Sequence, residues 1–83
     1  METTWVNIPG GLTDIGAGAD GSVWGVNAND DIFVLNADGS TWTHIAGKLR
    51  HIDVGPDGNA WGVNGAGNIY RCVWYEAPVL CSQ

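Results

Sequence analysis

An internal repeat of 37 residues constrains the fold of this chain more than any other feature of its sequence. When residues 5–33 are placed over residues 42–70, 13 of the 29 aligned positions are identical, without a gap. The identities include the run Trp-Gly-Val-Asn that begins at Trp24 and again at Trp61. A period of about 20–50 residues is typical of solenoids and propellers. The chain therefore contains two copies of one structural unit.

Within each repeat, short apolar segments alternate with turn residues such as Asp20-Gly21 and Asp57-Gly58, which is the chemistry of β-hairpins. The expected strands cover residues 12–18, 22–27, 31–35, 41–46, 49–55, 59–64 and 68–73. Strand spacings of roughly ten residues leave no room for crossover helices, so neighbouring strands must be antiparallel. The 3.6-residue period of a helix is absent. Four strands in one repeat match a propeller blade, and the sequence predicts an all-β fold of two four-stranded antiparallel blades.

The length of the chain, 83 residues with 13 Gly and 5 Trp, suits short strands and tight turns but not a closed ring. A domain of this size buries only about 60–65% of its unfolded surface. Two blades would leave two apolar flanks in water, so we expect the propeller to close by oligomerisation. The repeat also sets the expected boundaries. They are an N-terminal outer strand in 1–11 that completes a neighbouring blade, a first blade in 12–48, and a second blade with a C-terminal tail in 49–83.

The charge of the chain excludes some classes of partner. Its net charge is −6, and Lys48, Arg50 and Arg71 are its only basic residues other than histidine. Binding to nucleic acid or to an anionic membrane needs several basic groups on one face. No apolar stretch is long enough to span a bilayer, and no signal peptide is visible. We expect neither nucleic acid nor membrane insertion, and a secreted or extracellular location if the chain is natural.

The repeated pattern Trp-x2-Ile-x-Gly-x-Leu-x2-Ile-x2-Gly-x-Asp-Gly-x2-Trp-Gly-Val-Asn-x4-Ile-Phe/Tyr resembles the tectonin repeat over residues 5–72. That repeat occurs in fish egg lectins, in the horseshoe-crab lectin that recognises lipopolysaccharide, and in slime-mould and fungal tectonins. The resemblance implies a six-bladed propeller and a sugar-binding role in innate immunity. Family members carry five or six repeats in one chain, whereas this chain carries two, which suggests a homotrimer. A truncated or engineered fragment would show the same two repeats.

Polar residues near the turns are the candidates for sugar binding, because amides, carboxylates and guanidinium groups form hydrogen bonds with hydroxyls. The predicted carbohydrate-binding residues are Asn27, Asn29, Asp30, Asn64, Asn68, Arg71 and Trp74. For Asn27 and Asn64 the sequence favours turn capping over contact with a ligand. Asp30 and Asp31 are adjacent carboxylates with no cation nearby in the sequence; calcium would bind there if it binds at all, but the sequence requires no cofactor.

The repeat-matched tryptophans, including Trp24 and Trp61, are expected in the core rather than at a ligand. His44 and His51 have no partners at zinc spacing, so no metal site is expected. Cys72 and Cys81 are compatible with a disulfide or with two free thiols.

The sequence shows no catalytic constellation, so the chain is not expected to be an enzyme. The sequence favours a multivalent lectin, with microbial surface sugars or N-acetylated sugars as ligands. The alternative is a structural or engineered self-assembling propeller fragment without a ligand.

Overall fold

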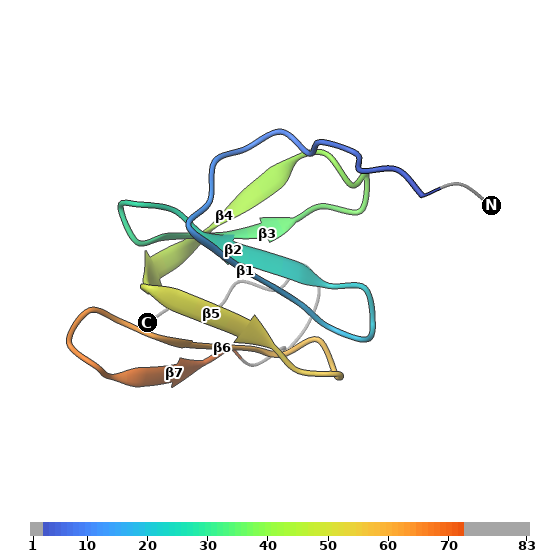
Figure 1. Ribbon diagram of the computed structural model, residues 1–83. Coiled ribbons are helices and arrows are strands. Elements are labelled where there is room, and N and C mark those ends of the chain that lie inside the picture. Colours follow the sequence, from blue (N-terminus) through green and yellow to red (C-terminus); the bar gives the residue numbers. More distant parts are fainter. Residues whose placement is uncertain (1–2, 73–83) are drawn as a thin grey trace.

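The computed structural model describes residues 3–72, which form seven β-strands (Figure 1). In chain order they are β1 (Asp14–Ala17), β2 (Val23–Val26), β3 (Asp31–Leu35), β4 (Trp42–Lys48), β5 (His51–Val54), β6 (Ala60–Val63) and β7 (Ile69–Arg71). Each of the seven segments expected from the sequence forms a strand, and residues 3–72 contain no helix.

The strands form two antiparallel sheets in which each strand pairs with its neighbour in the chain (Figure 1). The first sheet has the order β1-β2-β3-β4, and the described part of the second has the order β5-β6-β7. This simple meander is the topology of a propeller blade. The prediction of an all-β chain with two blades is confirmed, and its closure into a ring stays a prediction.

The hairpin turns share one backbone feature. In each turn, a residue with a positive φ lies one to three positions before the next strand begins. In the turn between β2 and β3, the amide of Asp30 donates to the carbonyl of Asn27 at 3.0 Å, and the amide of Asn27 donates to the carbonyl of Asp31 at 3.1 Å. Asp30 has a φ of 65°, and Gly67 has a φ of 85° at the same place between β6 and β7. Asp is among the few side chains that tolerate this left-handed conformation.

The strand register divides the first sheet into two faces. Trp24 lies opposite Val34, and Val26 lies opposite Ile32, so these side chains share one face. Ile15 lies opposite Gly25, on the other face. The same division holds in the second sheet, where Ile52 lies opposite Gly62. Trp24 and Val26 therefore lie on the opposite face of the sheet from Gly25.

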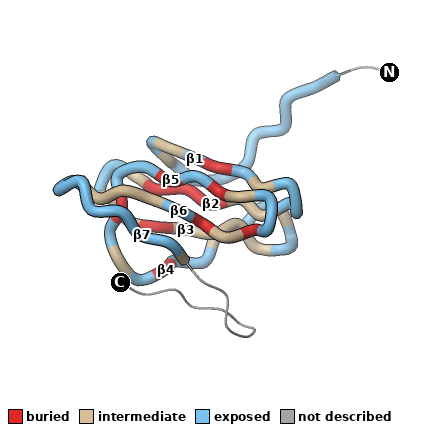
Figure 2. The backbone as a smooth tube through the Cα atoms, turned by 90° about the horizontal axis from the view of Figure 1, so that it is seen from below, coloured by how far each residue is buried: buried red, intermediate tan, exposed pale blue. Residues whose placement is uncertain are grey.

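The core lies between the two sheets, because the Trp24 face of the first sheet packs against the Ile52 face of the second. Figure 2 shows that buried segments occur in strands of both sheets. Strand β5 lies against β1 and β2. The buried hydrophobic residues are Trp24, Val26, Ile32 and Ile45 from the first blade and Leu49, Ile52, Val54 and Ala60 from the second. Burial of a side chain of this kind contributes about 1.5–3 kcal/mol, so the interface between the blades is the main source of stability.

A glycine allows the two inner strands to approach closely. A Cβ atom on Gly16 of β1 would lie 2.9 Å from the Cα of Asp53 and 3.1 Å from the amide nitrogen of Val54. Both neighbouring atoms belong to the backbone of β5, so neither could swing away. Only glycine fits at this point of the interface.

Residues 3–13 contain no strand. Trp5 is 101% exposed and Val6 is 74% exposed, and Figure 1 shows this segment leading from β1 past β4 and away from the sheets. The indole nitrogen of Trp42 in β4 donates to the carbonyl of Pro9 at 2.7 Å. That residues 1–11 complete a blade of another chain stays a prediction, as do the other two boundaries.

Candidate functional site

Two equivalent turns at one end of the sheets hold most of the predicted sugar-binding residues. In the first, the side-chain oxygen of Asn27 accepts hydrogen bonds from the amides of Asn29 at 3.0 Å and Asp31 at 2.9 Å. This asparagine closes its own turn, as Asx residues commonly do. Its amide oxygen is therefore already used by the backbone.

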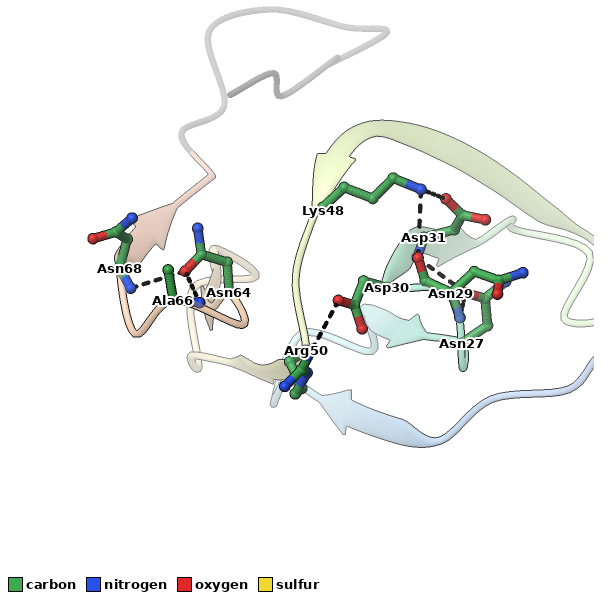
Figure 3. Close-up of polar contacts among 9 residues, drawn as sticks. All are labelled: Asn27, Asn29, Asp30, Asp31, Lys48, Arg50, Asn64, Ala66 and Asn68. Atoms are coloured by element: carbon green, nitrogen blue, oxygen red, sulfur yellow. Dashed lines mark hydrogen bonds and ion pairs between the residues drawn. The ribbon is translucent and has the colours of Figure 1, made fainter.

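The second turn repeats this arrangement between β6 and β7 (Figure 3). The side-chain oxygen of Asn64 accepts from the amides of Ala66 at 3.0 Å and Asn68 at 2.9 Å. Asn27 and Asn64 therefore both have the turn-capping role that the sequence favours for them. Whether either also contacts a ligand stays a prediction, as it does for Asn29 and Asn68 beside them.

The two adjacent carboxylates of the first turn each have a cation, which the sequence did not suggest (Figure 3). The ammonium group of Lys48 forms an ion pair with Asp31, and the guanidinium group of Arg50 lies 3.5 Å from Asp30. The hydrogen bond from Lys48 is the main cause that lowers the pKa of Asp31 below its ordinary value. Because both charges are balanced, this cluster gives no particular support to a calcium ion.

Arg50 connects the two turns across the junction of the blades. Besides its contact with Asp30, it lies over Gly65 of the second turn, where a Cβ atom would be 2.8 Å from a guanidinium nitrogen. Its side chain is 59% exposed. The site therefore combines donors from Arg50 with acceptors from Asp30 on a shallow, accessible surface between two blades.

Sequence reasoning missed Lys48 and Arg50, although a signal was present. Two of the three basic residues other than histidine stand in the short segment that joins one repeat to the next. A linker between blades runs beside the turns at one end of the sheets, so basic residues in it meet whatever carboxylates those turns carry. The repeat alignment did not indicate Arg50 as a site residue, because it pairs Arg50 with Thr13.

Arg71 lies elsewhere, on β7. Its guanidinium carbon is 5.4 Å from the centre of the Trp61 ring, which is the geometry of a cation–π contact. The structure does not bring Arg71 together with Arg50 and the turns. Trp74 lies outside the described residues, and the role of both residues in sugar binding stays a prediction.

The opposite end of the sheets is acidic. There Asp20, Asp38 and Asp57 each accept a hydrogen bond from a backbone amide two residues later, at 2.9, 2.9 and 3.1 Å. These amides are the first cause of the lowered pKa values of Asp20 and Asp38. No ion pair in residues 3–72 involves these carboxylates, so the two ends differ in charge balance.

A cavity of about 50 Å³ lies between the sheets, lined by residues that include Trp24, Ile45, Ala60 and Tyr70. It is mainly apolar and too small for a sugar ring. No group of three or more His, Cys, Asp or Glu side chains in residues 3–72 could hold a metal ion. The described part of the chain also has no helix that could cross a membrane.

Of the two cysteines, Cys72 is disulfide-bonded. Cys81 is the only other cysteine in the sequence and lies outside the described residues.

Comparison with protein-family models gives a match to the Tectonin domain over residues 1–78. The match covers most of the chain and confirms the family resemblance found in the repeat. A comparison with curated proteins gave no match.

Proposed function

We propose that this chain, which belongs to the tectonin domain family, is a non-catalytic carbohydrate-binding protein. Its site would be the junction of the blades around Arg50. The single observation that carries this proposal is the position of Arg50, which is exposed and shared by the turns of both blades.

The charge balance of the junction supports a neutral, hydroxylated ligand. Arg50 and Lys48 each have a carboxylate partner, Asp30 and Asp31, so the junction offers donors and acceptors without a net local charge. Sugar hydroxyls use both kinds of group. An anionic ligand would meet two compensated cations on a chain of net charge −6, which disfavours its binding.

The depth of the site supports weak binding at each junction. No described side chain encloses Arg50, and a shallow site excludes little water from its hydrogen bonds. Several junctions presented together would raise the apparent affinity by orders of magnitude. Microbial surface sugars and N-acetylated sugars are the proposed ligands.

A glycan array probed with the labelled chain tests the class of ligand. An NMR titration with N-acetylglucosamine then tests the site, because a monosaccharide in solution reports single-site binding without avidity. We expect the shifted resonances to belong to the two turns and to Arg50. A flat response to every glycan and to the monosaccharide would contradict the proposal.

Arg50→Ala and Arg71→Ala form a matched pair for this titration, because both remove an exposed arginine. Loss of a charged hydrogen-bond partner weakens binding by about tenfold or more. We expect the larger loss for Arg50→Ala, because this variant removes the arginine of the junction. The reverse result would move the site to Arg71 and the Trp61 ring beside it on the second blade.

A structural or interaction module without a sugar ligand is the second candidate function. The turn-capping role of Asn27 and Asn64 favours it, because their side-chain oxygens already accept two backbone hydrogen bonds each. Self-assembly of the chain together with a flat glycan response would select this function.

The disulfide at Cys72 supports a secreted or extracellular location, since disulfides persist in oxidising compartments. A chain isolated from its native source with Cys72 as a free thiol would contradict this location.

A further inference from the structure

Two sheet faces of this chain have the composition of a buried interface but lie open. On the second blade, Trp61 is 48% exposed and Ile69 is 74% exposed. On the first blade, Ile15 is 56% exposed. Each open face carries a shallow depression, of about 260 Å³ between Trp61 and Ile69 and about 230 Å³ between Leu12 and Trp42. We call them the Trp61 face and the Ile15 face.

The two open faces are the two halves of the interface that the chain already forms once. The Trp61 face repeats the buried face of the first blade, since Trp61, Val63 and Ile69 correspond to Trp24, Val26 and Ile32. The Ile15 face repeats the buried face of the second blade, since Leu12 and Ile15 correspond to Leu49 and Ile52.

At one further pair of positions, the Ile15 face carries the same two side chains as its counterpart in the second blade, but in exchanged places. In the second blade, Val54 lies opposite Ala60 across the strands β5 and β6. In the first blade, Ala17 lies opposite Val23 across β1 and β2. The same two side chains are exchanged between the paired positions, so the combined volume of the pair is unchanged. The Ile15 face therefore keeps, at this pair, the side-chain volume of the face that packs against Trp24.

The open edge of the second sheet also fits a second copy of this chain. Strand β7 has no fourth strand beside it in the described residues, and residues 5–8 are the counterpart of the start of β4. They lead into β1 as β4 leads into β5. A copy that docks its Ile15 face on the Trp61 face therefore brings its own residues 5–8 to the edge of β7. The register of β3 and β4 then places Ile8 of that copy opposite Ile69.

We propose that the Trp61 face binds the Ile15 face of a second copy of this chain, head to tail, and that Asp53 keeps this interface wider than the one inside the chain. The sequence puts Asp53 where the first blade has Gly16. A repeat of the internal contact would set the Cβ atom of Asp53 about 2.9 Å from the backbone of β1 in the second copy, as measured for Gly16. The inner strands must therefore stay further apart.

A second difference weakens the same contact. Inside the chain, the carboxylate of Asp14 accepts a hydrogen bond from the amide of Ile52 across the blades, at 2.8 Å. His51 stands at the corresponding position of the second blade. The amide of Ile15 in the docking copy thus meets an imidazole in place of a carboxylate.

Two variants, each with one face blocked, test the head-to-tail arrangement by analytical ultracentrifugation. Ile15→Asp blocks one face and Ile69→Asp blocks the other, and both side chains are already exposed within a single chain. Each variant alone should stay monomeric at concentrations at which the unmodified chain associates. Their equimolar mixture should form a dimer and nothing larger, because only one pair of intact faces remains. Association of either variant alone to the same extent as the unmodified chain would overturn the arrangement.

Asp53→Gly and Asp53→Ala test the role of Asp53, because both remove its charge and only the first removes its Cβ atom. We expect Asp53→Gly to tighten self-association by about tenfold or more and Asp53→Ala to change it little. Circular dichroism checks that both variants keep the fold. Equal tightening by both variants would refute the steric role. A chain that is monomeric at about 1 mM, with and without Asp53→Gly, would overturn the whole proposal, since a specific interface of this kind binds more tightly.

Discussion

Trp24 and Trp61 occupy the same place in two copies of one repeat, yet Trp24 is 2% exposed and Trp61 is 48% exposed. The opposite faces show the reverse difference, because Ile52 in the second blade is 6% exposed and Ile15 in the first is 56% exposed. Burial in this fold is thus set by the neighbouring blade and not by the residue. One blade does not cover either of its own faces.

Local structure shows no such difference between the blades. Asn27 and Asn64 close their turns with the same pair of backbone amides, at distances that agree within 0.1 Å. Turns depend on residues close in sequence, whereas the core depends on contact between sheets. The comparison therefore separates the part of the fold that one repeat specifies from the part that needs two.

The largest expected effect comes from removing the two tryptophans in turn. Trp24→Ala should lower the free energy of unfolding by about 3–5 kcal/mol, because it leaves a cavity in the core. Trp61→Ala should lower it by about 1 kcal/mol or less in dilute solution, since half of this side chain is already in water. Urea unfolding followed by circular dichroism measures both. Equal losses would show that another part of the chain covers Trp61.

A smaller effect is expected at the close approach between β1 and β5. Gly16→Ala would place a methyl group against the backbone of Asp53, and overpacking of this kind costs about 1–3 kcal/mol. Gly11→Ala is the control, because a Cβ atom there meets nothing within 4 Å. Thermal unfolding of both variants, compared with the unmodified chain, gives the difference. A tolerated Gly16→Ala would mean that the blades can separate without loss.

The fold was largely predictable from the sequence because its signals are local and repeated. Turn residues such as Asp20-Gly21 and Asp57-Gly58 separated the expected strands, and the period of 37 residues indicated the two blades. The exposure of Trp61 was not predictable from the repeat. The match with Trp24 predicted that Trp61 lies in the core, whereas it is half exposed. Its burial depends on a neighbouring blade, which residues 3–72 do not supply on that side.

The candidate site was predictable only in part, for a different physical reason. The turns that contain Asn27 and Asn64 have a clear sequence signature, but their amide oxygens are used within the turns. Arg50 has no basic counterpart in the repeat alignment, because the matching residue of the first repeat is Thr13. Its contact with both turns arises from the packing of two blades, which brings Asp30 and Gly65 next to one guanidinium group.

The smallest expected effect is a pH dependence confined to the first blade. The hydrogen bond from Lys48 lowers the pKa of Asp31 below its ordinary value of 3.8, and the charge of Lys48 and the Asn27 side chain act in the same direction. A carboxyl whose pKa is lower in the folded state stabilises the fold above its ordinary pKa. That stabilisation is lost as the pH falls through the folded-state pKa. The counterpart in the second blade, Asn68, does not titrate.

Asp31→Asn should therefore flatten part of the loss of stability below about pH 4 and have little effect on the shape of the curve near neutral pH. Asn68→Asp is the matched control. It places a carboxyl in the equivalent turn, where the described residues hold no counterpart of Lys48, so its pKa should stay closer to the ordinary value. NMR titration of the two carboxyl groups compares the turns directly. If both carboxyls titrate at the same pH, the ion pair with Lys48 does not stabilise the first blade, and the two turns are electrostatically equivalent.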